Sequence, residues 1–362
     1  MRAAVLNRVG ALDIETLHVD EPGPNEVRIR PHHVGLCHSD LHYIDGTHQT
    51  DLPEVLGHEA AGVVESIGEN VSRVSVGDHV VTSLTMFCGT CMYCVTGRLS
   101  LCEERARLRQ RPRPSLVNDA GEAVGVMGGV GAFAEMLVIH ENGVARLDRE
   151  LPLPVAALFG CAVLTGVGAV VRSADVRVGD TVAVIGCGGI GLAAVQGARL
   201  AGASRIIAID LAEAKLRAAA RFGATDILTS GSALQDELRK LVPNGVDFSF
   251  EAVGRRETVE AAMQALAPGG TCTVLGMVPD STPIQVPASQ LYFTEKRLQG
   301  AFIGSSRFVV DVAQLSALYG QRRLDLDGMI SHRLAFDEIQ RGFELLKHPD
   351  TLRVVLDMPA AD

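Results

Sequence analysis

The chain has 362 residues, of which 47% are apolar and 21% are charged, and these proportions exclude a disordered or fibrous protein. Its 43 acidic residues outnumber the 33 basic residues and leave a formal net charge of −10 at pH 7. This acidic balance argues against nucleic-acid binding, which requires a basic surface for the phosphates. The length is sufficient for two domains of ordinary size.

The amino-terminal residues contain no apolar stretch of signal-peptide length, so we expect a cytoplasmic protein that is not exported. Two uncharged stretches, residues 151–171 and 181–198, have the length of a membrane span. Both are rich in glycine, so we expect them to form buried core and predict no membrane contact. The eight cysteines are too sparse for a disulfide framework, and clustered reduced thiols are typical of metal ligands.

The first 150 or so residues contain short β-type runs, such as 27–30, 61–67 and 78–82, which are separated by glycine and proline turns. This pattern predicts an antiparallel or barrel-like β domain. Near residue 150 the pattern changes to strands that alternate with helices, which predicts a parallel sheet with crossover helices. In this part we expect strands at 181–185, 205–210, 248–251 and 271–275, and helices at 190–201 and 213–222.

After residue 302 the pattern changes again. Residues 309–319 and 336–346 have the apolar spacing of amphipathic helices, and residues 353–356 form an apolar run that predicts a last strand.

Four cysteines lie close together in the sequence with the spacing C-x2-C-x2-C-x7-C, at Cys88, Cys91, Cys94 and Cys102. Short loops between thiolates allow the sulfur atoms to converge on one ion. Four thiolates leave no open position, so a zinc ion held here would be structural. An iron–sulfur cluster is the alternative that this spacing leaves open.

A glycine turn, Gly186-Cys-Gly188-Gly-Ile-Gly191, follows the apolar run 181–185 and precedes a helical stretch. In a dinucleotide-binding turn the first glycine permits the tight turn, the second lets the backbone approach the pyrophosphate, and the third permits close helix–strand packing. Asp210 ends the next expected strand. Its carboxylate suits an adenosine ribose and repels a 2′-phosphate, which predicts NAD rather than NADP.

A third set of residues is dispersed along the chain: Cys37, His58 and Cys161. Two cysteines and one histidine can hold a catalytic zinc with an open fourth position. The spacing does not show that the three meet in space. A core histidine and a small buried cysteine are the plain structural alternatives.

In this order, the cluster Cys37-His-Ser-Asp-Leu-His42, the triplet Gly57-His-Glu59, the four cysteines and the glycine turn resemble the zinc-dependent medium-chain alcohol dehydrogenases. The long segment between Cys102 and Phe133 is similar to the liver-type and glutathione-dependent formaldehyde dehydrogenase branches and to related bacterial enzymes.

The resemblance implies an α/β protein with two domains and a homodimeric or homotetrameric assembly. A GroES-like, β-rich catalytic domain is expected at residues 1–162 and 303–362, with a structural zinc lobe at about 88–102. A Rossmann NAD-binding domain, a doubly wound parallel sheet, is expected at residues 163–302.

The resemblance also assigns roles to single residues. Cys37, His58 and Cys161 match the catalytic zinc ligands, and the four clustered cysteines match the structural zinc ligands. Asp40 matches a carboxylate that orients the ligating histidine, and Glu59 matches a carboxylate behind the zinc. Ser39 and His42 match the two ends of a proton relay from the substrate oxygen to solvent. The matching cofactor contacts are His38, Thr165, Gly186, Gly188, Gly189, Ile190, Gly191, Asp210, Lys215 and Arg353.

The activity that this implies is reversible hydride transfer from a primary or secondary alcohol to NAD, which gives an aldehyde or a ketone. Two alternatives keep the fold: NAD remains permanently bound and is re-oxidised by a second carbonyl compound, or the enzyme is a glutathione- or thiol-dependent formaldehyde dehydrogenase. A non-catalytic protein on this scaffold is disfavoured because all three zinc ligands are present. Many members have arginine where this chain has His38, so we expect a weaker hold on the pyrophosphate.

Five arginines lie between residues 105 and 113, and Pro112 and Pro114 lie beside them. This pattern predicts an exposed, extended loop, and a rim that attracts an acidic substrate or partner is the alternative. By resemblance, Leu84, Phe133 and Met277 are expected to line the substrate pocket, and His48 to reach it.

Overall fold

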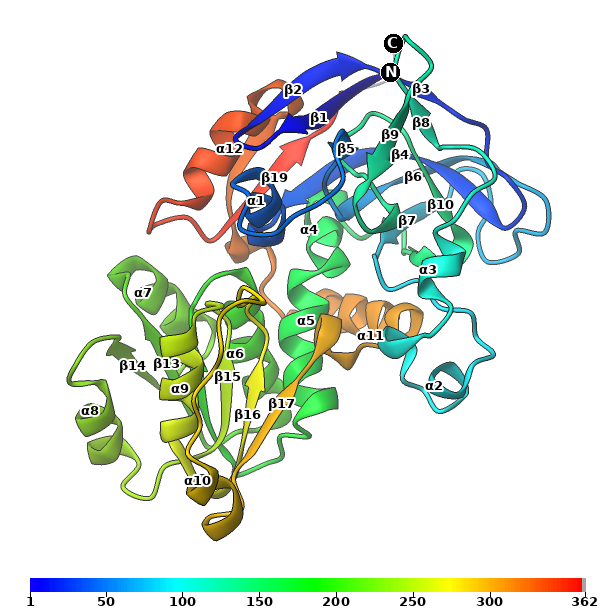
Figure 1. Ribbon diagram of the computed structural model, residues 1–362. Coiled ribbons are helices and arrows are strands. Elements are labelled where there is room, and N and C mark those ends of the chain that lie inside the picture. Colours follow the sequence, from blue (N-terminus) through cyan, green and yellow to red (C-terminus); the bar gives the residue numbers. More distant parts are fainter. Residues whose placement is uncertain (360–362) are drawn as a thin grey trace. The chain divides into compact units, whose positions relative to one another are not determined.

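The computed structural model describes residues 1–359, which form two compact units (Figure 1). Residues 1–161, 307–348 and 353–359 make up the first unit, and residues 162–306 and 349–352 make up the second. The expected mixed α/β fold, with a β-rich part and a parallel-sheet part, is confirmed.

The first unit is built on two β-sheets, most of whose strand pairs are antiparallel. In β4 (Glu26–Leu36), Val27 and Ile29 point into the core while their neighbours do not, because successive side chains of a strand face opposite sides. The first sheet has the order β2 (Ala11–Thr16), β1 (Arg2–Arg8), β5 (Glu54–Val55), β9 (Ala123–Val126), β8 (Leu116–Val117) and β3 (His18–Val19).

The second sheet of this unit carries the segments that matter for the site. Its order is β11 (Val144–Arg146), β7 (His79–Thr82), β6 (Glu59–Ile67), β4, β19 (Arg353–Asp357) and β18 (Ile330–Ala335), and β10 (Leu137–His140) also pairs with β4. The helices of the unit are α1 (His38–Ile44), α2 (Met92–Val95), α3 (Arg105–Leu108), α4 (Leu153–Ala157), α11 (Phe308–Gly320) and α12 (Ile339–Leu346).

The second unit contains one six-stranded parallel sheet. Its order is β14 (Asp226–Thr229), β13 (Arg205–Asp210), β12 (Thr181–Ile185), β15 (Val246–Glu251), β16 (Leu266–Val274) and β17 (Arg297–Gly300). Numbered within the sheet this is 3-2-1-4-5-6, the order of a Rossmann fold, so the expected doubly wound sheet is confirmed. Its helices are α5 (Ala162–Gly168), α6 (Gly189–Ala201), α7 (Glu213–Phe222), α8 (Leu234–Leu241), α9 (Arg256–Gln264) and α10 (Ala288–Phe293).

Two expectations about local structure are wrong in part. The helix expected at 336–346 begins at Ile339, after a short 3-10 turn over Phe336–Glu338. The arginine-rich segment does not form a wholly exposed, extended loop. It begins with the short helix α3, the side chain of Arg111 is largely buried, and Arg109 is half-buried. Tertiary packing outweighs the local preference of a charged, proline-rich stretch for solvent at these two positions.

Within residues 1–359, no single helix is both long and apolar enough to cross a membrane. A bent pair of helices over residues 153–173 reaches the length and hydropathy of a membrane span only when both helices are taken together. Most of these residues are buried inside the protein, as expected for core helices.

Candidate active site and metal centres

Three segments of the first unit bring the dispersed cysteines and histidine together. Cys37 directly follows β4, and His58 directly precedes β6. The antiparallel pairing of Gly35 with Glu59 places these two strand ends beside each other. Cys161 reaches the same point because Gly160 packs against β6. A Cβ atom on Gly160 would lie 2.9 Å from the Cα of Glu59, so the close approach requires glycine.

The ligand atoms of Cys37, His58, Glu59 and Cys161 all lie within 4.8 Å of one another. All four side chains are buried. Two sulfur atoms and one imidazole nitrogen match the donor set of a catalytic zinc, which keeps a further position for a water or a substrate oxygen. This arrangement therefore fits a divalent zinc ion.

The electrostatics of the cluster also fit a cation. The hydrogen bond from Cys161 holds the pKa of the Cys37 thiol well below its usual value, although burial opposes this shift. Burial lowers the pKa of His58, but Asp40 and Cys37 outweigh burial and raise it well above its usual value. A buried thiolate next to a second thiol is costly unless a positive charge compensates it, and a bound metal ion supplies that charge.

Asp40 fixes the orientation of His58. It is fully buried, and its Oδ1 lies 3.2 Å from His58 Nδ1 and accepts a hydrogen bond from the Gly57 amide at 3.1 Å. Its other oxygen accepts a hydrogen bond from the Cys37 amide at 3.2 Å. Asp40 thus holds both ligand-bearing segments and leaves His58 Nε2 for the metal, as a carboxylate behind a ligating histidine does.

We expect Asp40→Asn to lower zinc affinity at this site by about 10- to 100-fold, because the neutral amide no longer stabilises the histidine in its ligating orientation. Competition with a chromogenic chelator measures the affinity. Asp45→Asn, at the exposed end of the same helix, serves as the control and should bind zinc as the wild type does. Equal affinity in Asp40→Asn and the wild type would show that Asp40 has no such role.

Glu59 forms a buried ion pair with Arg353. The Arg353 guanidinium donates to Glu59 Oε2, whereas Glu59 Oε1 is buried without a hydrogen-bond partner and lies 4.0 Å from His58 Nε2. Burial raises the pKa of Glu59 to about 7, against the opposing charge of Arg353. The unpartnered oxygen gives the cluster one further potential metal ligand, and a role for Glu59 behind a zinc stays a prediction. Pyrophosphate contact by Arg353 stays a prediction.

The other expected substrate-side residues lie on or near α1. The sulfur atom of Cys37 lies 3.5 Å from Ser39 Oγ, and His38 is exposed at the start of the helix. The Nδ1 atom of His42 is buried without a partner, and burial lowers the pKa of this imidazole. Its ring packs edge-on against His48 at 5.6 Å, a pairing that no sequence pattern indicated.

The expected pocket residues differ in their exposure. Leu84 is half-buried, whereas Phe133 is fully buried and packs edge-on against Phe343. Phe133 therefore belongs to the core of the first unit. Met277 lies in the second unit, where its backbone contacts Gly254.

The four clustered cysteines form a second potential metal centre. The sulfur atoms of Cys88, Cys91, Cys94 and Cys102 lie within 4.8 Å of one another. Backbone amides donate to the sulfur atoms, from Cys91 to Cys88 and from Cys88 to Cys102, both at 3.2 Å. Hydrogen bonding from Thr90 lowers the pKa of Cys88 to about 6. Burial raises the pKa of Cys94 to about 12 and also raises that of Cys102. The convergence of four sulfur atoms fits a structural zinc.

In the second unit, the glycine turn joins β12 to α6. Gly186 has a φ of 94°, and a Cβ on Gly191 would lie 1.7 Å from the carbonyl oxygen of Gly186, so both positions require glycine. No atom lies within 4 Å of the position that a Cβ on Gly188 would occupy. This open space at the start of α6 fits a pyrophosphate, which binds at a helix N-terminus.

Asp210, at the end of β13, lies beside this turn. Its two carboxylate oxygens accept hydrogen bonds from the amides of Cys187 and Ala212 at 2.7 and 2.9 Å. These bonds fix the negative charge next to the turn, where it suits a ribose. Of the remaining expected contacts, Gly189 and Ile190 lie in the first turn of α6, Thr165 is buried in α5, and Lys215 is half-buried in α7.

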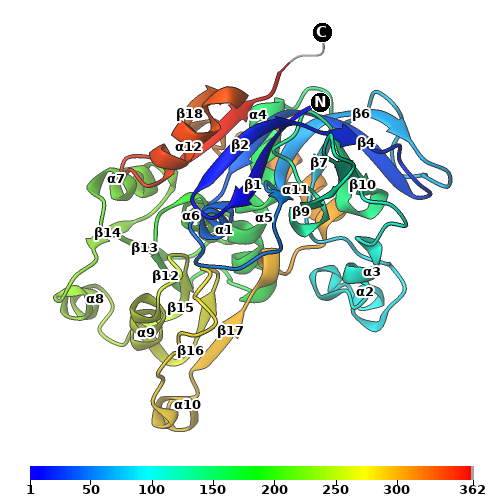
Figure 2. The same ribbon diagram turned by 45° about the horizontal axis from the view of Figure 1, so that its top comes forward.

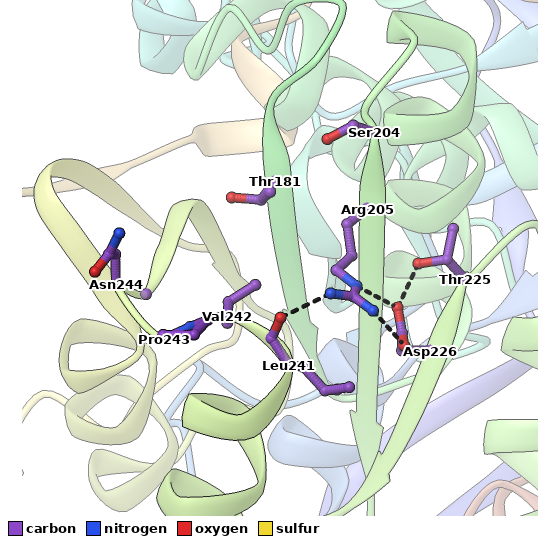
Figure 3. A pocket seen from close by; sticks show the side chains of 10 residues that line it. Thr181, Ser204, Arg205, Thr225, Asp226, Leu241, Val242, Pro243 and Asn244 are labelled. Atoms are coloured by element: carbon purple, nitrogen blue, oxygen red, sulfur yellow. Dashed lines mark hydrogen bonds and ion pairs between the residues drawn. The ribbon is translucent and has the colours of Figure 1, made fainter.

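A cavity of about 600 Å³ lies at the opposite, amino-terminal edge of the same sheet (Figure 3). The Arg205 guanidinium in this cavity is engaged by Asp226 at 2.8 Å and by the carbonyl oxygen of Leu241 at 2.7 Å. Since ligands of such sheets bind at the carboxyl ends of the strands, this cavity is not the candidate cofactor site.

Comparison with known proteins covers both units. An alcohol dehydrogenase GroES-like domain matches residues 23–149, and a zinc-binding dehydrogenase domain matches residues 189–318. The chain is 36% identical over 358 residues to S-(hydroxymethyl)glutathione dehydrogenase from Saccharomyces cerevisiae, which covers 95% of this chain and 92% of the yeast protein.

Solved structures are similar over the same length. An alcohol dehydrogenase zinc-binding domain protein from Burkholderia ambifaria has a TM-score of 0.93 at 32% identity, and benzyl alcohol dehydrogenase from Acinetobacter calcoaceticus has a TM-score of 0.90 at 30% identity. Each match covers 99% of both chains. A zinc-binding dehydrogenase from Sinorhizobium meliloti 1021 bound to NADP has a TM-score of 0.80 at 27% identity and covers 98% of both chains. The chain therefore belongs to the zinc-dependent medium-chain alcohol dehydrogenase family.

Proposed function

We propose that this zinc-dependent alcohol dehydrogenase transfers a hydride reversibly between a primary or secondary alcohol and NAD, with aldehyde or ketone as the product. The observation that carries the proposal is the buried convergence of Cys37, His58 and Cys161, with Asp40 behind the histidine. Zinc bound to these residues acts as a Lewis acid that favours the deprotonated form of an alcohol.

The chain's own residues then orient the reactants and move the proton. Asp40 holds His58 so that one imidazole nitrogen faces the metal position. The hydroxyl of Ser39 lies beside Cys37; it accepts the proton of the substrate oxygen and releases its own proton toward His42. His42 passes this proton to solvent. Its lowered pKa keeps the imidazole neutral near pH 7 and able to accept the proton.

NAD is the proposed hydride acceptor, and Asp210 is the residue that selects it. The fixed carboxylate beside the glycine turn accepts hydrogen bonds from the two ribose hydroxyls and repels a 2′-phosphate. The NADP-bound relative from Sinorhizobium meliloti makes this selection a point to test directly.

We expect Asp210→Ser to lower the preference for NAD over NADP, measured as the ratio of the two kcat/KM values, by about 10- to 100-fold. Loss of the hydrogen bonds to a charged group lowers kcat/KM with NAD. Loss of the repulsion toward the 2′-phosphate raises kcat/KM with NADP. Glu213→Gln, which removes a carboxylate from an exposed side chain of the adjacent helix, is the control. An unchanged ratio in Asp210→Ser would remove Asp210 from cofactor selection.

The proposed reaction is tested by the rise in NADH absorbance when zinc-loaded protein is given NAD and primary, secondary and aromatic alcohols. Turnover with free NAD supports the proposal. If no alcohol is oxidised and NAD stays with the protein through gel filtration, the permanently bound cofactor becomes the better description. The similarity to the yeast enzyme favours one further candidate, the oxidation of S-(hydroxymethyl)glutathione, which belongs in the same panel.

A homo-oligomer is the proposed assembly, as a dimer or a tetramer. Strand β17 is at the edge of its sheet, and Tyr292 and Phe293 of α10 and Leu298 of β17 are exposed apolar side chains. An open sheet edge with neighbouring apolar surface favours pairing with another chain. The expected cytoplasmic location stays a prediction.

A further inference from the structure

The arginine-rich segment borders a cavity in the first unit that the proposed reaction does not use. The cavity has a volume of about 250 Å³ and lies between this segment and strands β9 and β10. Strand β10 lies near α3 in Figure 2. Its polar lining includes Glu26, Arg109, Arg111, Arg113 and His140. Three arginines against one carboxylate give the lining a positive charge.

Two of these arginines already have acidic partners. Arg111 Nε lies 2.9 Å from Glu26, and Arg111 Nη2 lies 3.5 Å from Asp20. Arg113 lies 3.6 Å from Asp20, and 78% of its side chain is exposed. The charge of Arg111 is therefore compensated by these two carboxylates, and Arg113 is an exposed charge in the lining of the cavity.

Arg109 is different. Its one hydrogen bond within the described residues runs from Nη2 to the carbonyl oxygen of Leu84 at 2.7 Å, and its Nε is buried without a partner. No carboxylate of residues 1–359 forms an ion pair with it. Burial lowers the pKa of this guanidinium and the neighbouring Arg105 lowers it further, so both influences oppose a charge that arginine nevertheless keeps at pH 7.

Other half-buried or buried arginines of the same unit have such a partner. Arg30 pairs with Glu65 at 2.5 Å, Arg28 pairs with Glu21 at 2.8 Å, and Arg353 pairs with Glu59. An unpaired charge in this setting costs free energy that an anion in the cavity would recover. Arg28 and Arg353 also have a buried Nε without a partner, so it is the missing counter-charge that sets Arg109 apart. This missing counter-charge points to a ligand with negatively charged oxygens.

We propose that this cavity binds a small anion through carboxylate or phosphate oxygens and that Arg109 is the residue that holds it. The exposed Arg113 attracts the anion. Met86 and Val126 also line the cavity, and their apolar side chains suit a short carbon chain. At about 250 Å³ the cavity is smaller than sites for drug-sized molecules, which limits the ligand to a small acid or phosphate ester.

Calorimetric titration of the full, zinc-loaded chain with succinate and with inorganic phosphate tests this proposal. We expect at least one of them to bind the wild type, and Arg109→Gln to weaken that binding about tenfold or more, since a charge-assisted hydrogen bond is lost. Arg107→Gln is the matched control. It removes the same charge from the same segment, but Arg107 is exposed, pairs with Glu104 and does not line the cavity.

The proposal would be overturned if neither anion binds at about 10 mM, a limit near the weakest specific affinities. It would also be overturned if Arg109→Gln and Arg107→Gln weaken anion binding equally, because net charge alone would then explain the attraction. If Arg109→Gln does not fold because the Leu84 contact is lost, Arg113→Glu decides the matter. This exposed reversal of charge leaves the fold intact and should weaken binding severalfold, whereas unchanged affinity in Arg113→Glu would contradict the proposal.

The anion is either a group of the substrate or a separate molecule. The first source is considered because Arg109 donates a hydrogen bond to the carbonyl oxygen of Leu84, an expected lining residue of the substrate pocket. If it is part of the substrate, Arg109→Gln raises KM for a hydroxy acid about tenfold and leaves kcat and the KM of a neutral alcohol unchanged. If it is separate, both KM values are unchanged while the titration still shows the loss. The titration does not depend on turnover, so its outcome is distinguishable from a failure of the proposed reaction.

Discussion

Replacing Cys161 by alanine is expected to remove one of two zinc ions per chain and to lower kcat/KM for alcohol oxidation by about a thousandfold or more. Cys161 is buried with Cys37 and His58, and each supplies one ligand atom to the same point. Loss of one ligand leaves two, which do not retain a catalytic zinc. The reaction then lacks several kcal/mol of charge stabilisation. Atomic absorption on gel-filtered protein gives the zinc content, and steady-state kinetics give the activity.

Cys272→Ala is the control for this variant. Cys272 is also a buried cysteine, but it packs in the apolar core of the parallel sheet of the second unit. Its replacement should leave two zinc ions and normal kinetics. If Cys161→Ala retains both zinc ions and its activity, Cys161 is a core residue and not a ligand.

A second large effect is expected from Cys94→Ser in the four-cysteine lobe. Cys94 is buried against Phe87 and Cys102 in a small apolar cluster. So few apolar contacts do not order the lobe without its metal, and structural zinc sites contribute folding free energy directly. We therefore expect one zinc ion per chain, a thermal midpoint lower by about 10 °C or more, and proteolysis within residues 88–102.

Met92→Ser tests whether the effect of Cys94→Ser comes from the metal. Met92 is exposed in the same lobe, so its replacement should leave the zinc content and the thermal midpoint unchanged. A Cys94→Ser protein that keeps two zinc ions and melts like the wild type would contradict the structural zinc assignment.

Features with strong local signals were predictable from the sequence. The glycine turn lies between an apolar strand and a helix, as predicted, because Gly186 and Gly191 occupy positions that no other residue fits. The parallel sheet was predictable from the alternation of strands and helices after residue 180. Strands that are buried on both faces are apolar throughout, and this pattern can be read locally in the sequence. The four-cysteine cluster was predictable from the spacing of its cysteines alone.

Features that depend on contacts between distant segments were not predictable from local patterns. The partner of Arg353 is Glu59, 294 positions away in the chain, and no local pattern connects them. The arginine-rich segment was expected to be exposed because charge runs usually are. Arg109 is held instead by the carbonyl oxygen of Leu84, 25 positions away. The edge-on pair of His42 and His48 likewise follows from how the chain folds after α1.

Anomalous diffraction at the zinc absorption edge from crystals of the full chain tests both metal sites directly. We expect two peaks per chain. One lies among the sulfur atoms of Cys88, Cys91, Cys94 and Cys102, and the other lies between Cys37, His58 and Cys161. A missing second peak, or a peak bound by other residues, would contradict the assignment of this protein as a zinc-dependent alcohol dehydrogenase that uses these ligands.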